Sequence, residues 1–533
     1  MREAFALAPF ALAALAPFAP FPAAGEGEES GFAGGFASIA VQDLRVHLAE
    51  IASPAREGRD TPSAGQRAAA DYLIARLAEA GFAGAGPDGA FRLSFPRTLT
   101  APDPTGTSLV LSVPGAEPAP LALDVDFVPV PGCAGEAEGP IAFAGFGITD
   151  SGESYDDLRG RKLDGRIVVI LEGEPRHPRL FDGLALTPVA DLYRKLEKLE
   201  DAGAAAVLVV RRPPAEEAVG RDGAPIPAPP LGYRYGWASW NQDTTSPLPR
   251  RKRAQAFPAA EVTPAAASRL LGEDVLALAA RIDRAGRPLA WEPGEERAAL
   301  SCAFAAVPVA IDNVVGVLSG RDPGLAGEYV VIGAHYDHVG IDPWGRIGCG
   351  ADDNGSGTGA LLEVAEALAQ AGPRRSILAC AFAGEEDGLW GSEAFVAAPP
   401  VPLSAMVAML NLDMIGRGDP DEVIVLGVEP NPALGPLLKR AARLKGTRLD
   451  RIVVDRAAHL WPRSDHYPFH QHGIPCLFLF EAENESENPD YHTFRDTIDR
   501  LDFEKIVRTA RLTYNAAWLL ATDDDRPPAP RVR

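Results

Sequence analysis

The sequence predicts an α/β fold in which helices flank a mostly parallel central sheet. From about residue 300 onward, apolar runs of strand length alternate with helical segments, as in repeated strand–helix–strand units. The run Tyr329-Val-Val-Ile-Gly333 is apolar throughout, as expected of a parallel strand that is buried on both faces. Residues 120–285 differ, because short strand-like runs there alternate with segments rich in Pro and Gly, which indicates a second, β-rich unit.

Two helices are expected near the start of the chain. Apolar residues recur at helical spacing over 39–51 and again over 69–81, and the segment 58–63, Gly-Arg-Asp-Thr-Pro-Ser, separates the two helices. Gly81 and Gly84 end the second helix. Strands are then expected at 91–95, 108–112 and 121–130.

The rest of the chain follows two patterns. In the β-rich unit, strands are expected at 141–145, 166–170 and 205–210, and a helix at 189–202. In the part that follows, strands are expected at 329–333, 376–382, 405–412 and 476–480, and helices at 357–371, 433–445 and 503–521. Only this second pattern has the regular alternation that builds a parallel sheet.

Composition excludes several classes of protein. The chain has 533 residues, and 51 Lys and Arg against 73 Asp and Glu give a net charge of −22, which argues against binding nucleic acid or anionic lipid. An apolar fraction of 46% with 23% charged residues excludes wholesale disorder. The five cysteines are far apart and form no CxxC pair, so neither a disulfide scaffold nor a zinc finger is indicated.

The N-terminus carries the only strongly apolar stretch near the start, residues 5–20. It follows Arg2 and ends before small residues at 23–25, which is typical of a secretory leader, here assigned to residues 1–24. We therefore expect export, to the periplasm or the medium; the alternative is an unstructured Ala/Pro-rich leader. No stable membrane insertion is expected, and the sequence leaves the oligomeric state unknown.

Acidic and histidine residues follow the expected strands at 329–333, 376–382, 405–412 and 476–480. They are His335 and Asp337, Asp352 and Asp353 in a Gly-rich turn, Glu385 and Glu386, Asp413, and the pair Tyr491-His492. Ligands bind beyond the carboxyl ends of the strands in open α/β sheets, so we expect these side chains to converge.

The residue types indicate a metal site. Two histidines and three carboxylates without a thiolate suit a divalent ion, with zinc favoured. Several carboxylates in one cleft are costly unless cations neutralise them, and two ions about 3.5–4 Å apart, bridged by one carboxylate, would do so. Asp337 lies on the same side of an extended segment as His335 and can orient that ring. Of the adjacent Glu385 and Glu386, one can bind metal while the other acts as a general base.

The ordered motifs resemble the di-zinc exopeptidases of metallopeptidase family 28. They read AHYDHVG, GADDNGSG, FAGEEDGLWGS, LNLDMIG and YHTFRDTID, and the resemblance spans about 305–500, with a further match at about 57–82. The family implies a three-layer fold of the zinc exopeptidase type. The block with GFGI, YDDLRGRKLDGRIVVI and KLEDAGAAAVLVV resembles a protease-associated (PA) domain, which is commonly inserted in this peptidase fold.

The resemblance also implies roles for single residues. It makes His335 and Glu386 terminal ligands of one zinc, Asp413 and His492 terminal ligands of the other, and Asp353 the bridge, with two Zn²⁺ per chain. Glu385 becomes the general base, Asp337 the residue that orients histidine, and Tyr491 a stabiliser of the oxyanion. His338 matches the family pattern but is not counted as a ligand, and a cis bond is expected between Asp353 and Asn354.

The implied organisation has five parts: a leader at 1–24, catalytic segments at 36–120 and 286–525, an inserted PA domain at 121–285, and a disordered tail at 526–533. The implied function is a zinc-dependent aminopeptidase acting on peptides. A carboxypeptidase or dipeptidase stays open, because Arg417 and Arg463 lie near the site in sequence and would suit a substrate carboxylate. A non-catalytic relative and glutaminyl cyclisation are disfavoured, since every ligand position is filled.

Overall fold

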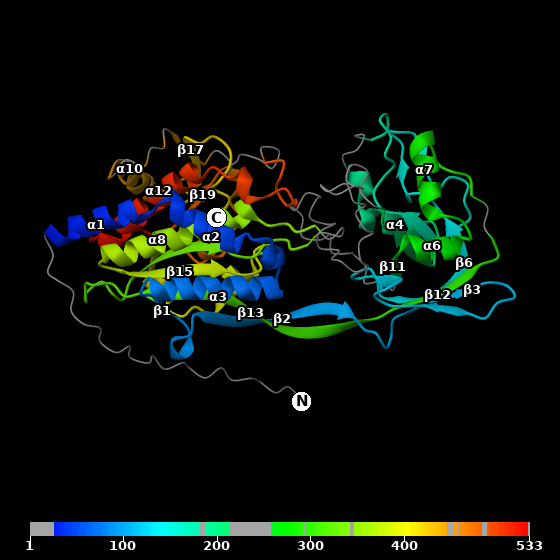
Figure 1. Ribbon diagram of the computed structural model, residues 1–533, viewed down its shortest axis with the longest axis horizontal. Helices are drawn as coiled ribbons and strands as arrows, with labels where there is room; N and C mark the ends of the chain where they lie inside the picture. Colours follow the sequence, from blue (N-terminus) through cyan, green and yellow to red (C-terminus); the bar gives the residue numbers. More distant parts are fainter. Residues whose placement is uncertain are drawn as a thin grey trace.

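The computed structural model describes residues 26–181, 187–212, 257–291, 294–341, 346–444, 447, 449, 451–455, 458–481 and 488–530. The predicted leader, 1–24, lies outside the described residues, as do 531–533 of the predicted tail. The described residues form two lobes, each built on its own sheet and joined by a long ribbon of two strands (Figure 1). No described helix is both long enough and apolar enough to cross a bilayer.

The larger lobe contains a nine-stranded sheet in the order β1-β13-β15-β14-β16-β19-β17-β18, with β2 paired to β13. Its strands are β1 (Ala83–Gly84), β2 (Arg92–Pro102), β13 (Phe304–Leu318), β14 (Tyr329–His335), β15 (Ser376–Phe382), β16 (Met406–Leu412), β17 (Glu422–Leu426), β18 (Arg451–Val454) and β19 (Cys476–Phe480). The central strands β15, β14, β16 and β19 run parallel, while β13 and β17 join them antiparallel. The predicted α/β fold with a mostly parallel centre is confirmed.

Helices cover both faces of this sheet, giving three layers. They are α1 (Glu26–Ser38), α2 (Val41–Ile51), α3 (Ala64–Glu79), α8 (Gly357–Ala371), α9 (Trp390–Ala397), α10 (Leu434–Leu444), α11 (His466–Gln471) and α12 (Phe503–Thr522). Strand β14 shows why both faces need cover: Val330 and Ile332 join the core under α8 and α12, whereas Val331 joins the opposite core with Phe395 of α9 and Phe469 of α11. This alternation is what an apolar run of strand length demands.

The second lobe contains an eight-stranded sheet in the order β4-β3-β12-β6-β9-β10-β11-β5. Its strands are β3 (Ser108–Ser112), β4 (Ala119–Leu121), β5 (Phe127–Pro129), β6 (Gly135–Phe143), β9 (Ile167–Leu171), β10 (Ala206–Val210), β11 (Ala259–Val262) and β12 (Arg297–Cys302), with helices α4 (Leu192–Asp201), α6 (Pro264–Leu271) and α7 (Val275–Ala285). Strands β3 and β12 and the first two residues of β4 lie outside the predicted insert at 121–285, so this sheet begins earlier and ends later than expected.

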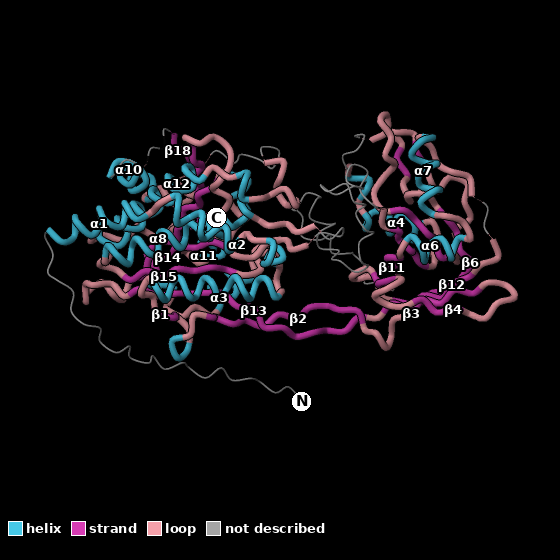
Figure 2. The backbone as a smooth tube through the Cα atoms, in the orientation of Figure 1, coloured by secondary structure: helices cyan, strands magenta, loops and turns pink. Residues whose placement is uncertain are grey.

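The ribbon consists of β2 and β13. These strands pair antiparallel from Arg92↔Val314 to Pro102↔Phe304, and the chain leaves the larger lobe on β2 and returns on β13 (Figure 2). The second lobe is therefore an insertion between two paired strands. At the other end of the chain, Arg526 donates to the carbonyl oxygens of Ser404 and Met406, so the first residue of the predicted tail contacts the larger lobe.

Candidate metal centre

The predicted site residues lie at strand ends or in loops beside them. His335 ends β14, Glu385 and Glu386 follow β15, Asp413 follows β16, Asp353 lies in the turn before α8, and His492 lies in the loop before α12. Parallel strands end at one edge of the sheet, so the fold brings these residues together as the sequence predicted. The peptide bond between Asp353 and Asn354 is cis, as expected.

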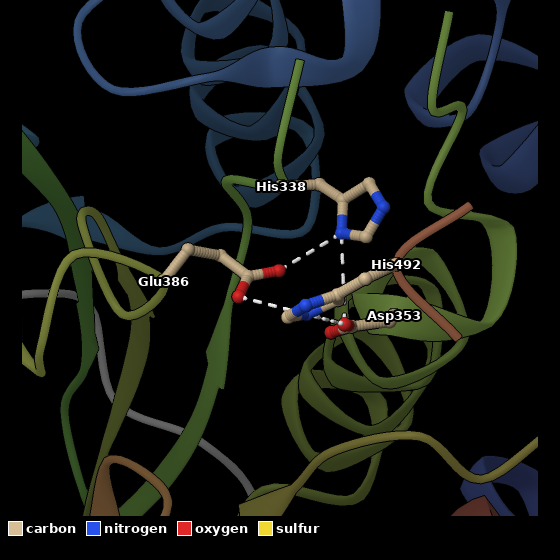
Figure 3. A group of neighbouring side chains, drawn as sticks. All are labelled: His338, Asp353, Glu386 and His492. Carbon is tan, nitrogen blue, oxygen red and sulfur yellow. Dashed lines mark hydrogen bonds and ion pairs between the residues drawn. The ribbon is translucent and has the colours of Figure 1, made fainter. Parts of the chain in front are cut away.

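One group of donor atoms comes from His338, Asp353, Glu386 and His492, all buried (Figure 3). The Nε2 atom of His492 lies 3.0 Å from Asp353 Oδ2 and 3.1 Å from Glu386 Oε2. The Nδ1 atom of His338 lies 2.9 Å from Glu386 Oε1 and 3.6 Å from Asp353 Oδ2. We call these four residues the inner group.

A second group comes from His335, Glu385 and Asp413, which we call the pocket group. The Nε2 atom of His335 lies 3.3 Å from Asp413 Oδ1 and 3.4 Å from Asp353 Oδ1. Asp353 thus turns Oδ1 toward the pocket group and Oδ2 toward the inner group, which is the arrangement of a bridging carboxylate.

These distances correct the pairing expected from sequence. His335 lies with Asp413 rather than with Glu386, and Glu386 lies with His492 rather than with Asp413. Strand order leaves both pairings open, because β14 lies between β15 and β16 and His335 therefore has Glu386 on one side and Asp413 on the other. Side-chain direction decides between them, and strand spacing does not encode it.

Electrostatics show that the centre needs positive charge. Burial would lower the pKa of His492, but Glu386 and Asp353 outweigh it and raise the pKa to about 10. Burial would raise the pKa of Asp353, but hydrogen bonds from His335 and His492 hold it well below its usual range. Four carboxylates thus meet three imidazoles in a buried space, which favours bound cations. Imidazole and carboxylate donors without thiolates fit zinc.

Asp337 holds the loop that carries the two glutamates. It is fully buried, and its carboxylate accepts the backbone N–H groups of Glu385 at 3.3 Å and Glu386 at 3.4 Å. The Nδ1 atom of His335 lies closer to the main-chain oxygen of Asp337, at 3.3 Å, than to its carboxylate, at 3.7 Å. The backbone of Asp337 therefore orients the ring, while its side chain orients the loop.

The residues of the pocket group line a pocket. His335, Asp353, Glu385 and Asp413 line it together with Met414, Leu460, Arg463, Phe478, Phe480, Asn488 and Tyr491. Glu385 keeps some exposure there, and burial with the charges of Glu386 and Asp413 raises its pKa well above the usual range despite His335. The ring of Tyr491 stacks on that of His492 at 3.8 Å between centroids, and burial raises its pKa.

The Ser464-Asp465-His466 segment supports the site from a neighbouring loop. Ser464 Oγ donates to Asp413 Oδ2 at 2.7 Å and accepts from Asn411 Nδ2 at 2.8 Å, so it fixes Asp413. His466 stacks on Phe478 at 4.5 Å, and burial lowers its pKa to about 3. A hydroxyl that binds a predicted ligand leaves no signal in strand spacing.

Two further buried acids shape the turn at Asp353. The carboxylate of Asp496 accepts the backbone N–H of Asp352 at 2.9 Å and that of Asp353 at 3.0 Å. Asp352 Oδ1 accepts the N–H of Gly416 at 2.9 Å. Asp352 is therefore used in backbone contacts, while its neighbour faces both donor groups.

Residues 313–517 match the description Peptidase family M28. Among curated relatives, a probable leucine aminopeptidase of Arthroderma benhamiae is 34% identical over 206 residues, covering 37% of this chain and 56% of that protein. Leucine aminopeptidase 1 of Coccidioides posadasii is 32% identical over 213 residues, covering 37% and 54%. The chain thus spans about half the length of the curated relatives it matches.

Two solved structures share the fold across most of the chain. A zinc aminopeptidase from Bacillus subtilis aligns with a TM-score of 0.53 at 19% identity, covering 92% of this chain and 98% of that one. A Peptidase M28 precursor from Shewanella amazonensis aligns with a TM-score of 0.52 at 17% identity, covering 95% and 100%. The likeness includes both lobes, since the covered shares exceed the larger lobe.

Proposed function

We propose that this chain, whose residues 313–517 belong to peptidase family M28, is a zinc-dependent aminopeptidase that removes N-terminal residues from peptides. One observation carries the proposal: Asp353 joins the inner group to the pocket group, and Glu385 of the pocket group lines the pocket. Relatives named leucine aminopeptidases support the choice of activity.

Two Zn²⁺ ions would be held by the two groups. Asp353, Glu386 and His492 would bind one ion, and Asp353, His335 and Asp413 the other, while Glu385 stays free. Bound ions would supply Lewis acidity to the substrate carbonyl and lower the pKa of water. The remaining roles fall to side chains of this chain.

Glu385 acts as the general base. Its carboxylate takes a proton from the attacking water and delivers it to the leaving amine as the peptide bond breaks. A pKa raised well above that of an ordinary glutamate brings the group closer to neutral pH, where a base that must also serve as an acid is most effective. The N–H groups held by Asp337 keep the glutamate loop in place.

Tyr491 stands in the pocket where its hydroxyl can donate to the oxyanion that forms on the carbonyl oxygen. The raised pKa keeps the hydroxyl protonated at neutral pH, so it is available as a donor. Ser464 holds Asp413 through its hydrogen bond. Tyr491→Phe should lower the turnover number on a short substrate while binding of metal is unchanged.

The pocket favours an apolar side chain at the N-terminus of the substrate. Met414, Leu460, Phe478 and Phe480 form apolar walls beside Glu385. Burying a side chain such as Leu in such a site is worth about 1.5–3 kcal/mol, which selects Leu over small or charged residues.

A carboxypeptidase or dipeptidase is the second candidate, and Arg463 favours it. This side chain lines the pocket, whereas Arg417 places both terminal nitrogens 3.1 Å from Asp490 Oδ2 and is committed to that pair. A panel of aminoacyl p-nitroanilides, N-blocked peptides and C-blocked peptides separates the two activities. An aminopeptidase cleaves leucyl p-nitroanilide and C-blocked peptides and leaves N-blocked peptides intact; the reverse pattern rejects it.

The inserted lobe we assign to a PA domain that controls access of substrates, and the sequence of residues 1–24 supports export. Cell fractionation with sequencing of the mature N-terminus tests the second assignment. The role of the inserted lobe in access is tested by deleting the lobe. Ala101 and Ala305 are directly paired, so an Asn-Gly turn can replace 102–304 and close a hairpin. Activity on short and on long peptides is then compared between the full chain and this deletion variant. The same ratio of the two activities in both proteins would reject a role of the lobe in substrate access.

A further inference from the structure

His338 is the member of the inner group that sequence reasoning set aside. It lies three residues after His335, and its ring is 1% exposed. Figure 3 shows its Nδ1 atom directed at the carboxylates of Glu386 and Asp353, on the side of the centre where His492 also lies. Nothing in the mechanism above uses this ring.

We propose that His338 is a fourth protein ligand of the ion held by Asp353, Glu386 and His492. The inference rests on the proposed function, because it assumes that the centre binds metal. Each of the four residues offers a donor atom within 4.8 Å of the other three. Four nitrogen–oxygen distances among them run from 2.9 to 3.6 Å, with Glu386 using Oε1 toward His338 and Oε2 toward His492. Zinc–ligand bonds of about 2.0–2.2 Å in a tetrahedron place donors about 3.3–3.6 Å apart, so the group is close to that shape.

The fold makes room for this ring. Gly350 has φ +58°, and a Cβ atom there would lie 2.5 Å from the His338 ring and 2.4 Å from the main-chain oxygen of Asp353. Any other residue at 350 would therefore push the ring away from the centre. Gly350 therefore leaves space for the His338 ring next to Asp353.

A fourth ligand would make the two metal positions unequal. The pocket is lined by His335, Asp353, Glu385 and Asp413, and none of His338, Glu386 and His492 lines it. The inner position would then have four protein donors and no opening to the pocket. The pocket position would have three, with Glu385 kept as base. Closed four-ligand sites are typical of zinc that stays bound, and three-ligand sites of zinc that meets substrate.

The test is a metal titration of the chelator-stripped full chain with Zn²⁺. Wild type should bind two ions with separable affinities. His338→Gln keeps a donor for Glu386 but removes the imidazole, and it should weaken the tighter ion by more than the roughly 10–100-fold that outer-shell groups cost. His472→Gln is the matched control, because His472 is exposed and its Nδ1 atom lies 2.8 Å from the carbonyl oxygen of Pro468, so its titration should equal wild type.

A second measurement needs no variant. In the Co²⁺-substituted protein, each ligating imidazole gives one paramagnetically shifted, exchangeable ring N–H proton signal. The Nε2 atom of His338 is buried, so its proton is protected from solvent exchange. We expect signals from three rings, His335, His338 and His492, and one fewer in His338→Gln.

The outcomes separate this inference from the function it rests on. Signals from two rings in wild type, or unchanged zinc affinities in a folded His338→Gln protein, would overturn the fourth ligand and leave the aminopeptidase standing. Wild type that binds no metal would overturn both. If thermal unfolding shows that the variant does not fold, the ring count in wild type decides alone.

Discussion

Both lobes place charged residues where parallel strands end, but they neutralise them differently. In the inserted lobe, Arg211 follows β10 and lies 3.2 Å from Glu172 and 3.1 Å from Glu261, and Arg212 lies 2.8 Å from Asp283. In the larger lobe, the carboxylates at the equivalent edge face imidazoles across the inner and pocket groups.

This difference indicates that the charged residues at the strand ends have a structural role in the inserted lobe and a functional role in the larger lobe. A guanidinium beside a buried carboxylate neutralises it permanently, so these ion pairs of the inserted lobe need no bound cation. An imidazole neutralises a carboxylate only while it is protonated, and it is also a metal ligand. Buried acids opposite histidines therefore mark the lobe that we expect to bind cations.

Metal removal should have the largest effect, and only on the larger lobe. Stripping the ions with a chelator should abolish peptidase activity and lower the temperature at which the larger lobe unfolds, because its buried carboxylates lose their cations. Zinc should restore both, as followed by hydrolysis of leucyl p-nitroanilide and by calorimetry. Full activity in the metal-free protein would contradict the inference that the larger lobe depends on bound cations and the inserted lobe does not.

Glu385→Gln should come next. Loss of a general base costs about 10²–10⁴-fold, so the turnover number should fall by at least about a hundredfold. The metal content should stay at the wild-type value, because Glu385 is the acid that the proposal keeps off the ions. Near-normal turnover with both ions present would remove Glu385 from this role, and Glu429→Gln, an exposed acid outside the predicted site, serves as the control.

The sequence was sufficient for those features that depend on periodicity and strand order. Helix α8 and strand β15 have the predicted bounds, and the ends of the parallel strands converge as expected. Three features needed the third dimension. The pairing of ligands depends on which way Glu386 turns, the place of His338 depends on the opening beside Gly350, and the role of Ser464 depends on a contact between distant loops.

The inserted sheet was predicted too small for a related reason. Strands β3 and β12 alternate between buried and half-buried or exposed residues, and their partners lie far away in sequence. A strand was expected at 108–112, but only this pairing shows that β3 and β12 belong to the sheet of the inserted lobe. Helices α9 and α11 are short, with eight and six residues, which is too few for a periodic pattern to emerge.

Arg211→Met should destabilise the inserted lobe. It leaves Glu261 buried without its guanidinium, and breaking such a pair costs about 3–5 kcal/mol of unfolding free energy. The double variant Arg211→Met/Glu261→Met should recover part of that loss. Chemical denaturation measures both, while turnover of a short substrate should match wild type. A double variant less stable than the single one would show that the pair does more than neutralise charge.

A change at Lys195 of the inserted lobe should give the smallest effect. This side chain of α4 is 2% exposed and donates to the carbonyl of Gly173, and burial lowers its pKa to about 8 despite Glu172 and Asp157. The unfolded chain holds this proton until about pH 10.4, so the folded lobe loses it first. Stability of the inserted lobe should therefore rise between about pH 8 and 10.4, by up to about 3 kcal/mol. Lys195→Met removes the buried charge, so its unfolding free energy should exceed wild type at pH 7 and the gap should close at pH 10. A gap that is constant with pH would mean that the Lys195 ammonium stays charged in the folded lobe, stabilised by Glu172 and Asp157. Acidic side chains would then stabilise a cation in both lobes, an ammonium in the inserted lobe and, as we propose, zinc in the larger lobe.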